Sequence, residues 1–440
     1  MENIDLELGD VDMIQERVLR FLNRVKTEHS LNEQITPSIY MAPHTLRDLS
    51  PHSFNPRVVS IGPLHRDDAN VQAFERHKST YLIYLMSRMI SQQEIIMNSC
   101  MQKVYASMEK IKACYVLTKT YDDVEFVEMM VMDVCFILGF ILQVFVSFVE
   151  SNLEGVFYLG DIVVDLVLLE NQIPFFFLAE IFKCTIAELD LGMSLVTFMP
   201  PVLLMLDLFD SDAVLGITES ISVNDIHHIL SLLHECYKPK KDVINSEESL
   251  STRSHSAVDL DKAGVSFKPN RSQTWVLWIE MEFPCFLLSW CKCTLRMPIL
   301  KVHDSTELIL RNLIAYELES RQTRKYITSY AFVMDMLVNT QDDVAKLIDS
   351  KVLVNIMGSN EEAANMINNI CKHVTIVDSF YTQQWKTLDK YSNNYWPKHI
   401  AWMRRTYFSS PWNIIALVVG SILFALTMVQ TIFTVKGGNK

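Results

Sequence analysis

The sequence predicts a mainly α-helical protein with a minor β element, in which a large helical cytosolic domain precedes one C-terminal transmembrane helix. Three observations lead to this fold class. Only 12 of the 440 residues are glycine, which disfavours a turn-rich all-β fold. Apolar residues recur at spacings of three and four in several stretches, the period of an amphipathic helix. A long uncharged segment near the C-terminus has the length that a bilayer requires.

Composition disfavours several classes of function. A net charge of −13 argues against nucleic acid as a partner, because binding to phosphates needs a basic surface. The nine cysteines are an odd number without a CxxC pair, and Cys291-Lys-Cys293 has no second half for a zinc site. We therefore expect buried, reduced thiols, and we predict neither a bound metal nor a cofactor.

Residues 1–30 are predicted to form an N-terminal tail with one amphipathic helix. Apolar residues such as Val11, Ile14 and Val18 stand three or four positions apart, so one face of this helix can dock on the main body. The stretch opens with acidic residues and has neither a basic n-region nor a long apolar h-region. It does not read as a signal peptide, and the bulk of the chain is expected in the cytosol.

Residues 31–410 are predicted to form the main domain, which is mostly helical. Residues 73–97 have the pattern of one long helix, and further helices are expected over residues 100–150 and 160–235. Two apolar stretches within these ranges, residues 134–149 and 195–208, are too short to span a bilayer. We expect both to be core helices, the second interrupted by a pair of prolines.

A change of character follows in residues 238–270, which are charged, rich in serine and poor in large apolar residues. This composition predicts an exposed or disordered loop. The runs GVSFKP and TWVLWIEMEFPCFLLSWCKCTLRMPILKV contain short stretches of β-prone residues, which favour a small sheet. A helical pattern resumes near Ser305 and continues to about residue 400.

Residues 413–435, NIIALVVGSILFALTMVQTIFTV, carry no charge and are long enough to span a hydrocarbon core of about 30 Å. Trp402, Tyr407 and Trp412 precede them, as an interfacial aromatic belt would. Only residues 436–440 follow, so we expect a single-pass, tail-anchored protein whose partner is the lipid bilayer. Lys398, Arg404 and Arg405 outnumber the two lysines after the span, which favours a cytosolic N-terminal domain at either the plasma membrane or an endomembrane.

Short motifs for catalysis or cofactor binding are missing from the sequence. It contains no nucleophile elbow, P-loop, dinucleotide-binding glycine pattern or zinc-protease motif, so no catalytic, cofactor-binding or metal residue is predicted. His227 and His234 stand seven positions apart, and on a helix they would be about 10 Å apart, too far to bind one metal directly. Together with His228 they are expected on the surface.

Two polar blocks are the strongest candidates for a site. In VVSIGPLHRDDANVQAFERHKSTYL, residues 58–82, His65, Glu75 and His77 offer acid–base groups without an evident nucleophile, and Glu75 with Lys78 forms an ordinary i, i+3 surface pair. An alternative function, a membrane-associated hydrolase, would place its site near His65, Glu75 and Glu170.

The second block is DLVLLENQIPFFFLAEIF, residues 165–182. Pro174 restricts the residue before it and suits the first turn of a helix, so one helix should end near Glu170 and another begin at PFFFLAEIF. Asn171 and Gln172 would then pair with backbone groups at the two helix ends. Glu170 in apolar surroundings needs a donor such as Arg or Lys, and we expect a structural joint here.

These two blocks, together with AGVSFK, LRNLIAYE, ITSYAFVMDMLVNTQDDVAKLIDSKVLVNIMGSNEEAANMINNI and YFSSPWNIIALVVGSILFALTMVQTIFTV, closely resemble the plant domain-of-unknown-function 247 family from about residue 35 to 435. The resemblance implies a plant single-pass membrane protein with a C-terminal anchor, and no catalytic residue. It also implies a link of some relatives to grass self-incompatibility, as candidate determinants of recognition between pollen and stigma, and of others to growth or stress.

Two hypotheses for the function follow. The first is a tail-anchored protein-recognition or signalling-interaction module that binds a protein partner of unknown identity. The family resemblance links this module to a self-incompatibility-like reproductive pathway. The second is the membrane-associated hydrolase. The anchor, the acidic composition and the missing enzyme motifs favour the first, and the oligomeric state is left open.

Overall fold

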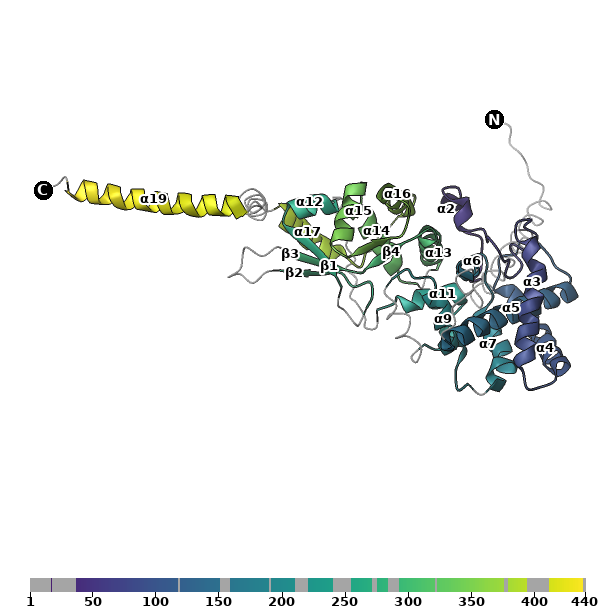
Figure 1. The fold of residues 1–440 in the computed structure, drawn as a ribbon. Helices are drawn as coiled ribbons and strands as arrows, with labels where there is room; N and C mark the ends of the chain where they lie inside the picture. The colour runs from purple at the N-terminus through teal and green to yellow at the C-terminus, as the bar shows by residue number, and fades with distance from the viewer. Residues whose placement is uncertain are drawn as a thin grey trace, which may run out of the picture. The chain divides into compact units, whose positions relative to one another are not determined.

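The computed structural model describes residues 17, 37–117, 119–150, 159–189, 191–209, 221–239, 255–270, 275–283, 293–320, 323–375, 379–393 and 411–437. The predicted amphipathic helix of residues 10–30 lies outside these residues, apart from residue 17. The chain divides into two compact units. Unit 1 comprises residues 1–206 and 214–236, and unit 2 comprises residues 207–213 and 237–440. Both contain mainly helices, and the β-structure is minor, as the sequence predicts (Figure 1).

The named elements of unit 1 are all helices, joined by turns and irregular segments. Its helices are α2 (His44–Arg47), η1 (Pro51–Ser53), α3 (Gln72–Arg88), α4 (Gln93–Ala113), α5 (Asp123–Val149), α6 (Gly160–Asp165), α7 (Phe175–Cys184), η3 (Ile186–Leu189), α8 (Leu195–Phe198), α9 (Pro200–Leu204), η4 (Val223–Asp225) and α11 (Ile229–Cys236).

Helix α5 is the centre of unit 1, and α3, α4, α7 and α9 all pack against it (Figure 1). Its N-terminus is capped by Asp122, whose side chain accepts a hydrogen bond from the N–H of Val124. The helix is long and apolar enough to cross a membrane, but 78% of its most apolar window is buried inside the protein. This confirms residues 134–149 as part of a core helix. The stretch 195–208 contains two short helices, α8 and α9, which are divided at its prolines as predicted.

The single long helix predicted over residues 73–97 is wrong. Helix α3 ends at Arg88, because Met89 adopts an extended conformation, and α4 begins at Gln93. Ile90, in the break, is 82% exposed. The break allows α4 to pack on α5 and α7 in a direction of its own, which an uninterrupted helix could not do.

Unit 2 contains the strands. Its elements are α12 (Ala257–Lys262), β1 (Val265–Pro269), β2 (Glu280–Glu282), β3 (Cys293–Met297), β4 (Leu300–Val302), α13 (Thr306–Glu319), α14 (Tyr326–Leu337), α15 (Gln341–Asp349), β5 (Leu353–Asn355), α16 (Asn360–Ile370), α17 (Thr382–Asn393) and α19 (Pro411–Gly437). Strand β3 is paired with β1 in the parallel orientation and with β2 in the antiparallel orientation. Strands β4 and β5 are parallel to each other. The predicted small sheet is therefore present.

The loop predicted over residues 238–270 is shorter than expected at its C-terminal side. Residues 257–262 form α12, which is capped by the Ser256 side chain, and Ala257 and Leu260 are buried. A six-residue helix needs only two buried apolar residues, so composition alone could not reveal it. Residues 240–254 of the predicted loop are not among those described.

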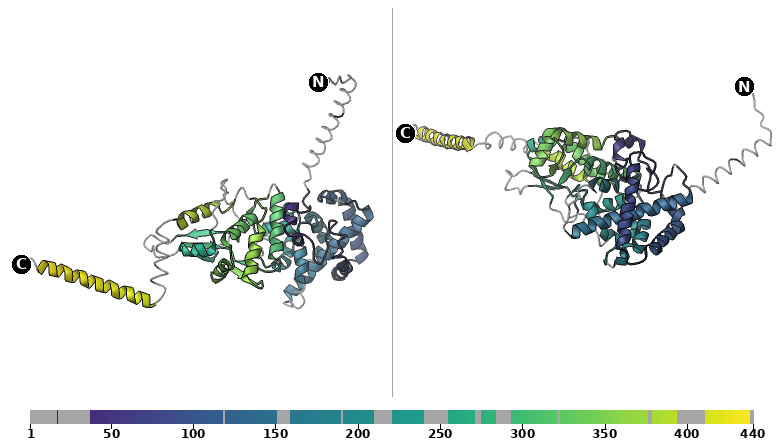
Figure 2. Two further views of the ribbon diagram at one scale, coloured as in Figure 1. Left: turned by 90° about the horizontal axis from the view of Figure 1, so that it is seen from above. Right: turned by 45° about the vertical axis from the view of Figure 1, so that its right-hand side comes forward.

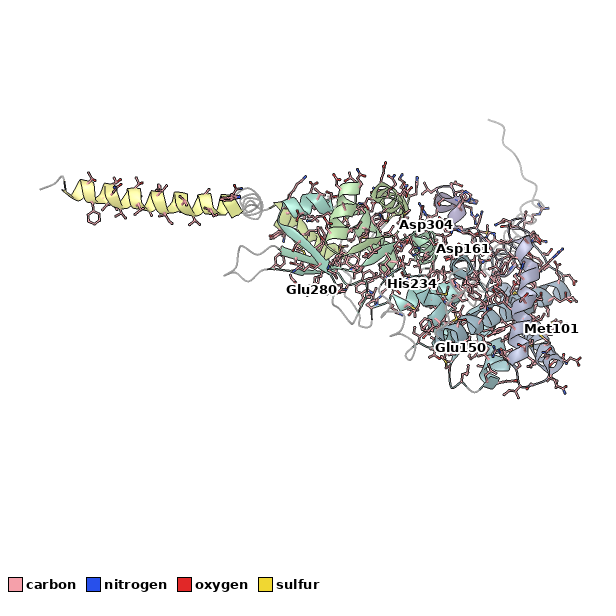
Figure 3. The ribbon with its side chains drawn as sticks, viewed as in Figure 1. Met101, Glu150, Asp161, His234, Glu280 and Asp304 are labelled. Carbon is pink, nitrogen blue, oxygen red and sulfur yellow. The ribbon has the colours of Figure 1, made fainter. Side chains whose placement is uncertain are left out.

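Helix α19 contains the predicted membrane segment. Residues Ile415–Thr434 are apolar enough to span a bilayer, and none of their most apolar window is buried within the protein. Figure 2 draws α19 as one unbroken helix, and Figure 3 shows its side chains projecting on all sides. Its hydroxyl groups, such as those of Ser421 and Thr427, donate to carbonyl oxygens four residues earlier. These hydroxyl groups are thus satisfied without water.

The described cysteines are all free thiols. Five are buried, as predicted, and two are partly exposed. The buried group is Cys100, Cys135, Cys236, Cys293 and Cys371, and the partly exposed group is Cys114 and Cys184.

Candidate functional site

The two polar blocks of the sequence meet in unit 1. Residues 57–62, here called the 57–62 segment, form no strand and pair with no strand among the described residues. The carboxylate of Asp165, at the end of α6, instead accepts hydrogen bonds from the N–H groups of Arg57, Val58 and Val59 at 2.9, 2.7 and 2.9 Å. A side chain thus replaces a neighbouring strand, which explains why a β-prone run does not join a sheet.

Asn171 and Asp133 extend this pairing along the same segment. Asn171 accepts from the N–H of Ile61 at 2.6 Å and donates to the carbonyl oxygens of Val59 and Asp165 at 3.0 and 2.9 Å. Asp133, in the middle of α5, accepts from the N–H of Gly62 at 2.8 Å. Since these side chains are almost fully buried, their bonds specify the path of the 57–62 segment.

Gly62 ends the segment in a conformation that other residues rarely adopt, with φ of 72°. A Cβ atom at this position would lie 2.9 Å from the carbonyl oxygen of Gln172 and 3.1 Å from the hydroxyl of Tyr115. The same carbonyl accepts a hydrogen bond from the Tyr115 hydroxyl at 2.9 Å. Close approach of the two blocks therefore requires glycine here.

Lys78 is the buried cation beneath the segment. Its side chain is 0% exposed, and its ammonium donates to the carbonyl oxygen of Ser60 at 2.6 Å and to Asp133 at 2.5 Å. Glu75 lies 2.6 Å from the same ammonium and also pairs with Arg66. The prediction of an ordinary surface pair between Glu75 and Lys78 is wrong, because the partner that draws Lys78 inward lies on α5, 55 residues further along the chain.

Glu170 is fully buried and has three donors. Its carboxylate pairs with the guanidinium of Arg47, accepts from the N–H of Ala42 at 2.7 Å and lies 2.9 Å from Nε2 of His65. The prediction that Glu170 needs an Arg or Lys partner is confirmed. Asp68 holds the other ring nitrogen of His65 at 2.7 Å.

A histidine between two carboxylates is best described as a cation. Both ring nitrogens of His65 can donate to ionised carboxylates only when the imidazole is protonated. Burial lowers the pKa of His65, but the hydrogen bonds and charges of Glu170 and Asp68 outweigh it and raise the pKa above its usual 6.5. The raised pKa favours the positively charged form of this histidine over the free base.

Gln172 completes the joint between α6 and α7. Its Nε2 donates to the carbonyl oxygens of Leu166 and Leu168 at 2.8 and 2.7 Å, and its Oε1 accepts from the N–H of Leu230 at 3.3 Å. Helix α7 begins directly after Pro174, as predicted. Helix α6 ends at Asp165, earlier than the predicted end near Glu170, because the turn that follows is held by the Asn171 and Gln172 side chains.

The structure brings together two of the three residues of the hydrolase alternative. His65 and Glu170 are in contact, whereas Glu75 belongs to the cluster around Lys78 and Arg66. His77 is exposed and stacks on Phe74 with ring centroids 5.3 Å apart. The chemical groups of the site are a cationic histidine, His65, bound between two carboxylates, and further carboxylates that already accept hydrogen bonds.

The prediction of three surface histidines near residue 230 holds only for His227. His228, directly before α11, is 0% exposed, and His234, on α11, is 1% exposed. Burial, together with the nearby histidines, lowers the pKa of His228 to about 3, so its ring is neutral and its Nδ1 accepts from the N–H of Ser231 at 3.1 Å. No group of three or more potential metal ligands occurs in the described part of the chain.

Ser392, His255 and Asp389 of unit 2 contact one another, and the sequence analysis did not predict this group. His255 Nε2 lies 2.6 Å from the carboxylate of Asp389 and 3.4 Å from the hydroxyl of Ser392. A catalytic triad needs the two partners on opposite ring nitrogens, but here they share one. The group joins the start of the α12 region to α17, and no local signal could reveal it, because His255 stands more than 130 positions before Asp389 and Ser392.

Comparison with known proteins gives one consistent result. The family described as plant protein of unknown function, domain-of-unknown-function 247, matches residues 39–426. The UPF0481 protein At3g47200 of Arabidopsis thaliana is 25% identical over 427 residues, covering 89% of this chain and 85% of that protein. The putative UPF0481 protein At3g02645 of Arabidopsis thaliana is 23% identical over 510 residues, covering 94% and 93%. No solved structure matches the chain.

Proposed function

The chain belongs to the plant domain-of-unknown-function 247 family, and from that premise we propose that it is a tail-anchored membrane protein that acts as a protein-recognition or signalling-interaction module. Helix α19 is the observation that supports the membrane anchor. Its 20-residue apolar stretch, Ile415–Thr434, is exposed to solvent, and leaving so much hydrocarbon in water is unfavourable at about 25 cal/mol per Å². A bilayer removes that cost and suits the length of the helix.

The proposed orientation places the large N-terminal part in the cytosol, on the basis of the excess of basic residues before the span. Protease protection on sealed membranes tests it. Digestion of residues 1–400 in intact vesicles is the expected result, and digestion only after the vesicles are ruptured would reverse the assignment. The choice between plasma membrane and endomembrane is open to fluorescence microscopy of the full-length chain.

The recognition role is supported by the buried carboxylates of unit 1, which are already paired inside the protein. Asp165, Glu170 and Asp133 are each 0% exposed, and each accepts hydrogen bonds from the backbone or from a basic side chain. An acid–base catalyst needs a group that can exchange a proton with a substrate, and these carboxylates are engaged inside the protein. We assign the block to holding the fold, which leaves the exposed surface for partners.

A role in self-recognition during reproduction is the finer part of this proposal. It derives from the resemblance to family members linked to grass self-incompatibility, and the residues of this chain add no argument for one pathway over another. The hydrolase alternative has one favourable observation, the contact of His65 with Glu170 at 2.9 Å. In that case the pair would have to release a proton to a bound substrate.

Affinity purification from plant membranes tests the recognition role. The bait is the full-length chain, and the comparison bait lacks residues 411–437. A partner that is recovered with the first bait and from membranes only, in amounts unaffected by His65→Gln, is the expected result. Recovery of no specific protein would count against recognition, and a hydrolytic activity of the purified chain that disappears in His65→Gln would favour the alternative.

A further inference from the structure

Exposed apolar side chains gather in unit 1 near the start of the described chain. The N–H of Val116 donates to the carbonyl oxygen of Ile39 at 3.0 Å, so the chain around residue 39 lies against the residues that follow α4. Val116 is exposed, and so is Met41, two positions after Ile39. Val124 in the first turn of α5 is 65% exposed, and Tyr105 on α4 is 68% exposed. Apolar side chains that share one surface indicate a contact with another element.

The contact between α4 and α5 brings these side chains to one surface. Lys112, in the last turn of α4, lies 2.7 Å from Asp123, which directly precedes Val124 in the first turn of α5. Tyr105 stands seven positions before Lys112, so both project from the same side of α4, two turns apart. Val116 follows Lys112 by only four positions. We call this surface the α4–α5 face, defined by Met41, Tyr105, Val116 and Val124.

The α4–α5 face is acidic on the side of α5. Asp122, Glu125 and Glu128 are all exposed at the beginning of this helix. The two lysines before them in the chain, Lys112 and Lys119, already pair with other aspartates at 2.7 Å. An element that covers this face should therefore combine apolar side chains with positive charge.

Residues 10–30 have this combination in their sequence. Val18 and Val25 stand seven positions apart and share the apolar side of the predicted helix. Arg17 and Arg24 each stand one position before them, so they form a basic row beside the apolar row. Arg17, the one described residue of this stretch, is helical and exposed.

The length of the connecting chain restricts where this helix can lie. Residues 31–36 separate it from residue 37, and six extended residues reach at most about 20 Å. A helix of residues 10–30 is about 30 Å long, the same as the 21-residue helix α4. If its C-terminal end lies near Val116, it extends along α4 past Tyr105.

We propose that residues 10–30 dock as an amphipathic helix on the α4–α5 face of their own chain. The apolar row covers Tyr105, Val116 and Val124. The basic row lies beside Glu125 and the other exposed carboxylates at the start of α5. The docked helix closes this face to a protein partner for as long as it is bound there.

Photo-crosslinking of the full-length chain in detergent tests the docking. The photoreactive residue p-benzoylphenylalanine replaces Tyr105, and after irradiation the joined peptides are identified by mass spectrometry. The expected product joins position 105 to residues 10–30. The same reagent in place of Ile83, an exposed residue on α3, is the matched control and should not join to residues 10–30.

A mixture of ¹⁵N-labelled and unlabelled chains identifies the occupant of the face. Products that carry a single label are expected, because the helix docks on its own chain. Products with mixed labels would mean that a second copy covers the face, and they would overturn the proposal. A bond from position 105 to another segment or to detergent, no bond at all, or equal joining from position 83 would overturn it as well.

Variants of the N-terminal segment test each row separately. Val18→Asp combined with Val25→Asp should lower the yield of the product by at least about tenfold, because both charges would enter an apolar contact. Arg24→Glu should lower it too, and adding Glu125→Arg should restore it. Glu16→Gln, on the opposite side of the predicted helix, is the matched control and should change nothing. Full yield in the double aspartate variant would refute the apolar contact, and a failure to restore would refute the position of the basic row.

Discussion

His65 and Glu170 form a buried ion pair between residues that are 105 positions apart, with Nε2 of the histidine 2.9 Å from the carboxylate. Since Asp68 accepts from the other ring nitrogen and Arg47 pairs with the same Glu170 carboxylate, the histidine connects two negative groups and Glu170 connects two positive ones. The alternation leaves the cluster close to neutral, which allows it to be buried. The loop after Gly62 and the turn before α7 are joined by this contact.

The first prediction concerns the dependence of stability on pH. The pKa of His65 is raised in the folded state above its unfolded value of 6.5. A raised histidine pKa means that its contribution to stability is fully present below 6.5 and is lost as the pH rises through the folded pKa. We expect the free energy of unfolding of the full-length chain in detergent to fall as the pH rises above 6.5 and through the raised folded pKa, and His65→Gln to make this fall smaller.

Two other buried groups do not account for a change in stability above about pH 6.5. Burial raises the pKa of Asp165 to about 6, against its backbone hydrogen bonds, so its effect on stability is complete below this pH. Burial lowers the pKa of His228 to about 3, so that residue changes stability only between about pH 3 and its unfolded value of 6.5. Equal slopes for the wild type and His65→Gln above about pH 6.5 would contradict the assignment of a protonated His65.

The second prediction is that Glu170→Gln destabilises the protein by about 3–5 kcal/mol, the usual cost of removing one member of a buried ion pair. The amide keeps the size of the side chain, but it leaves Arg47 and the protonated His65 without their shared counter-charge. Denaturant unfolding measures the loss. Glu109→Gln on the exposed side of α4 is the control and should change stability by less than about 0.5 kcal/mol. A similar small change for Glu170→Gln would show that the charge at this position is not needed.

Sequence reasoning succeeded where the signal is local. Pro174 predicted where α7 begins, and an apolar run containing Glu170 predicted a basic partner for that carboxylate. The mainly helical class, the core position of α5 and the small sheet could also be read from period and composition. In each case the residues that determine the prediction lie within about 20 positions of one another, a length over which a helical or strand pattern can be recognised.

It failed where the decisive partner is distant. Lys78 next to Glu75 looks like an ordinary surface pair, and only Asp133 on α5 makes it a core residue. His228 and His234 look polar, but α11 buries them as its apolar positions do. The break between α3 and α4 at Met89 has no proline or glycine to announce it. Tertiary packing decides such positions, and one sequence does not report it.

The third prediction tests the distant pairing of Lys78 and Asp133. Lys78→Met should cost about 3–5 kcal/mol, because Asp133 then carries an unpaired charge in the core. Adding Asp133→Asn should recover part of this loss, since an asparagine is neutral and its oxygen can still accept from the N–H of Gly62. A double-mutant cycle measured by denaturant unfolding gives the coupling, and additive losses in the double variant would be the contrary result.

The last prediction concerns the crossing of α3 and α5. A Cβ atom at Gly139 would lie 2.3 Å from the carbonyl oxygen of Tyr81 and 2.9 Å from its carbonyl carbon, and both atoms belong to the backbone of α3. A flexible side chain could move aside, but a helix backbone moves only if the two helices separate. We expect Gly139→Ala to destabilise the protein by about 3 kcal/mol, the upper part of the usual range for overpacking.

Gly160→Ala provides the matched control for this crossing. Gly160 begins α6 and has no atom within 4 Å of the position of a Cβ, so the same substitution there meets open space. We expect a change of less than about 0.5 kcal/mol, with any effect toward stabilisation, because alanine restricts the unfolded chain more than glycine. Thermal and denaturant unfolding of both variants gives the comparison. If Gly139→Ala were as stable as Gly160→Ala, the close contact of α3 with α5 at Tyr81 could not be correct, and the positions of Lys78 and Asp133 on those two helices would have to be reconsidered with it.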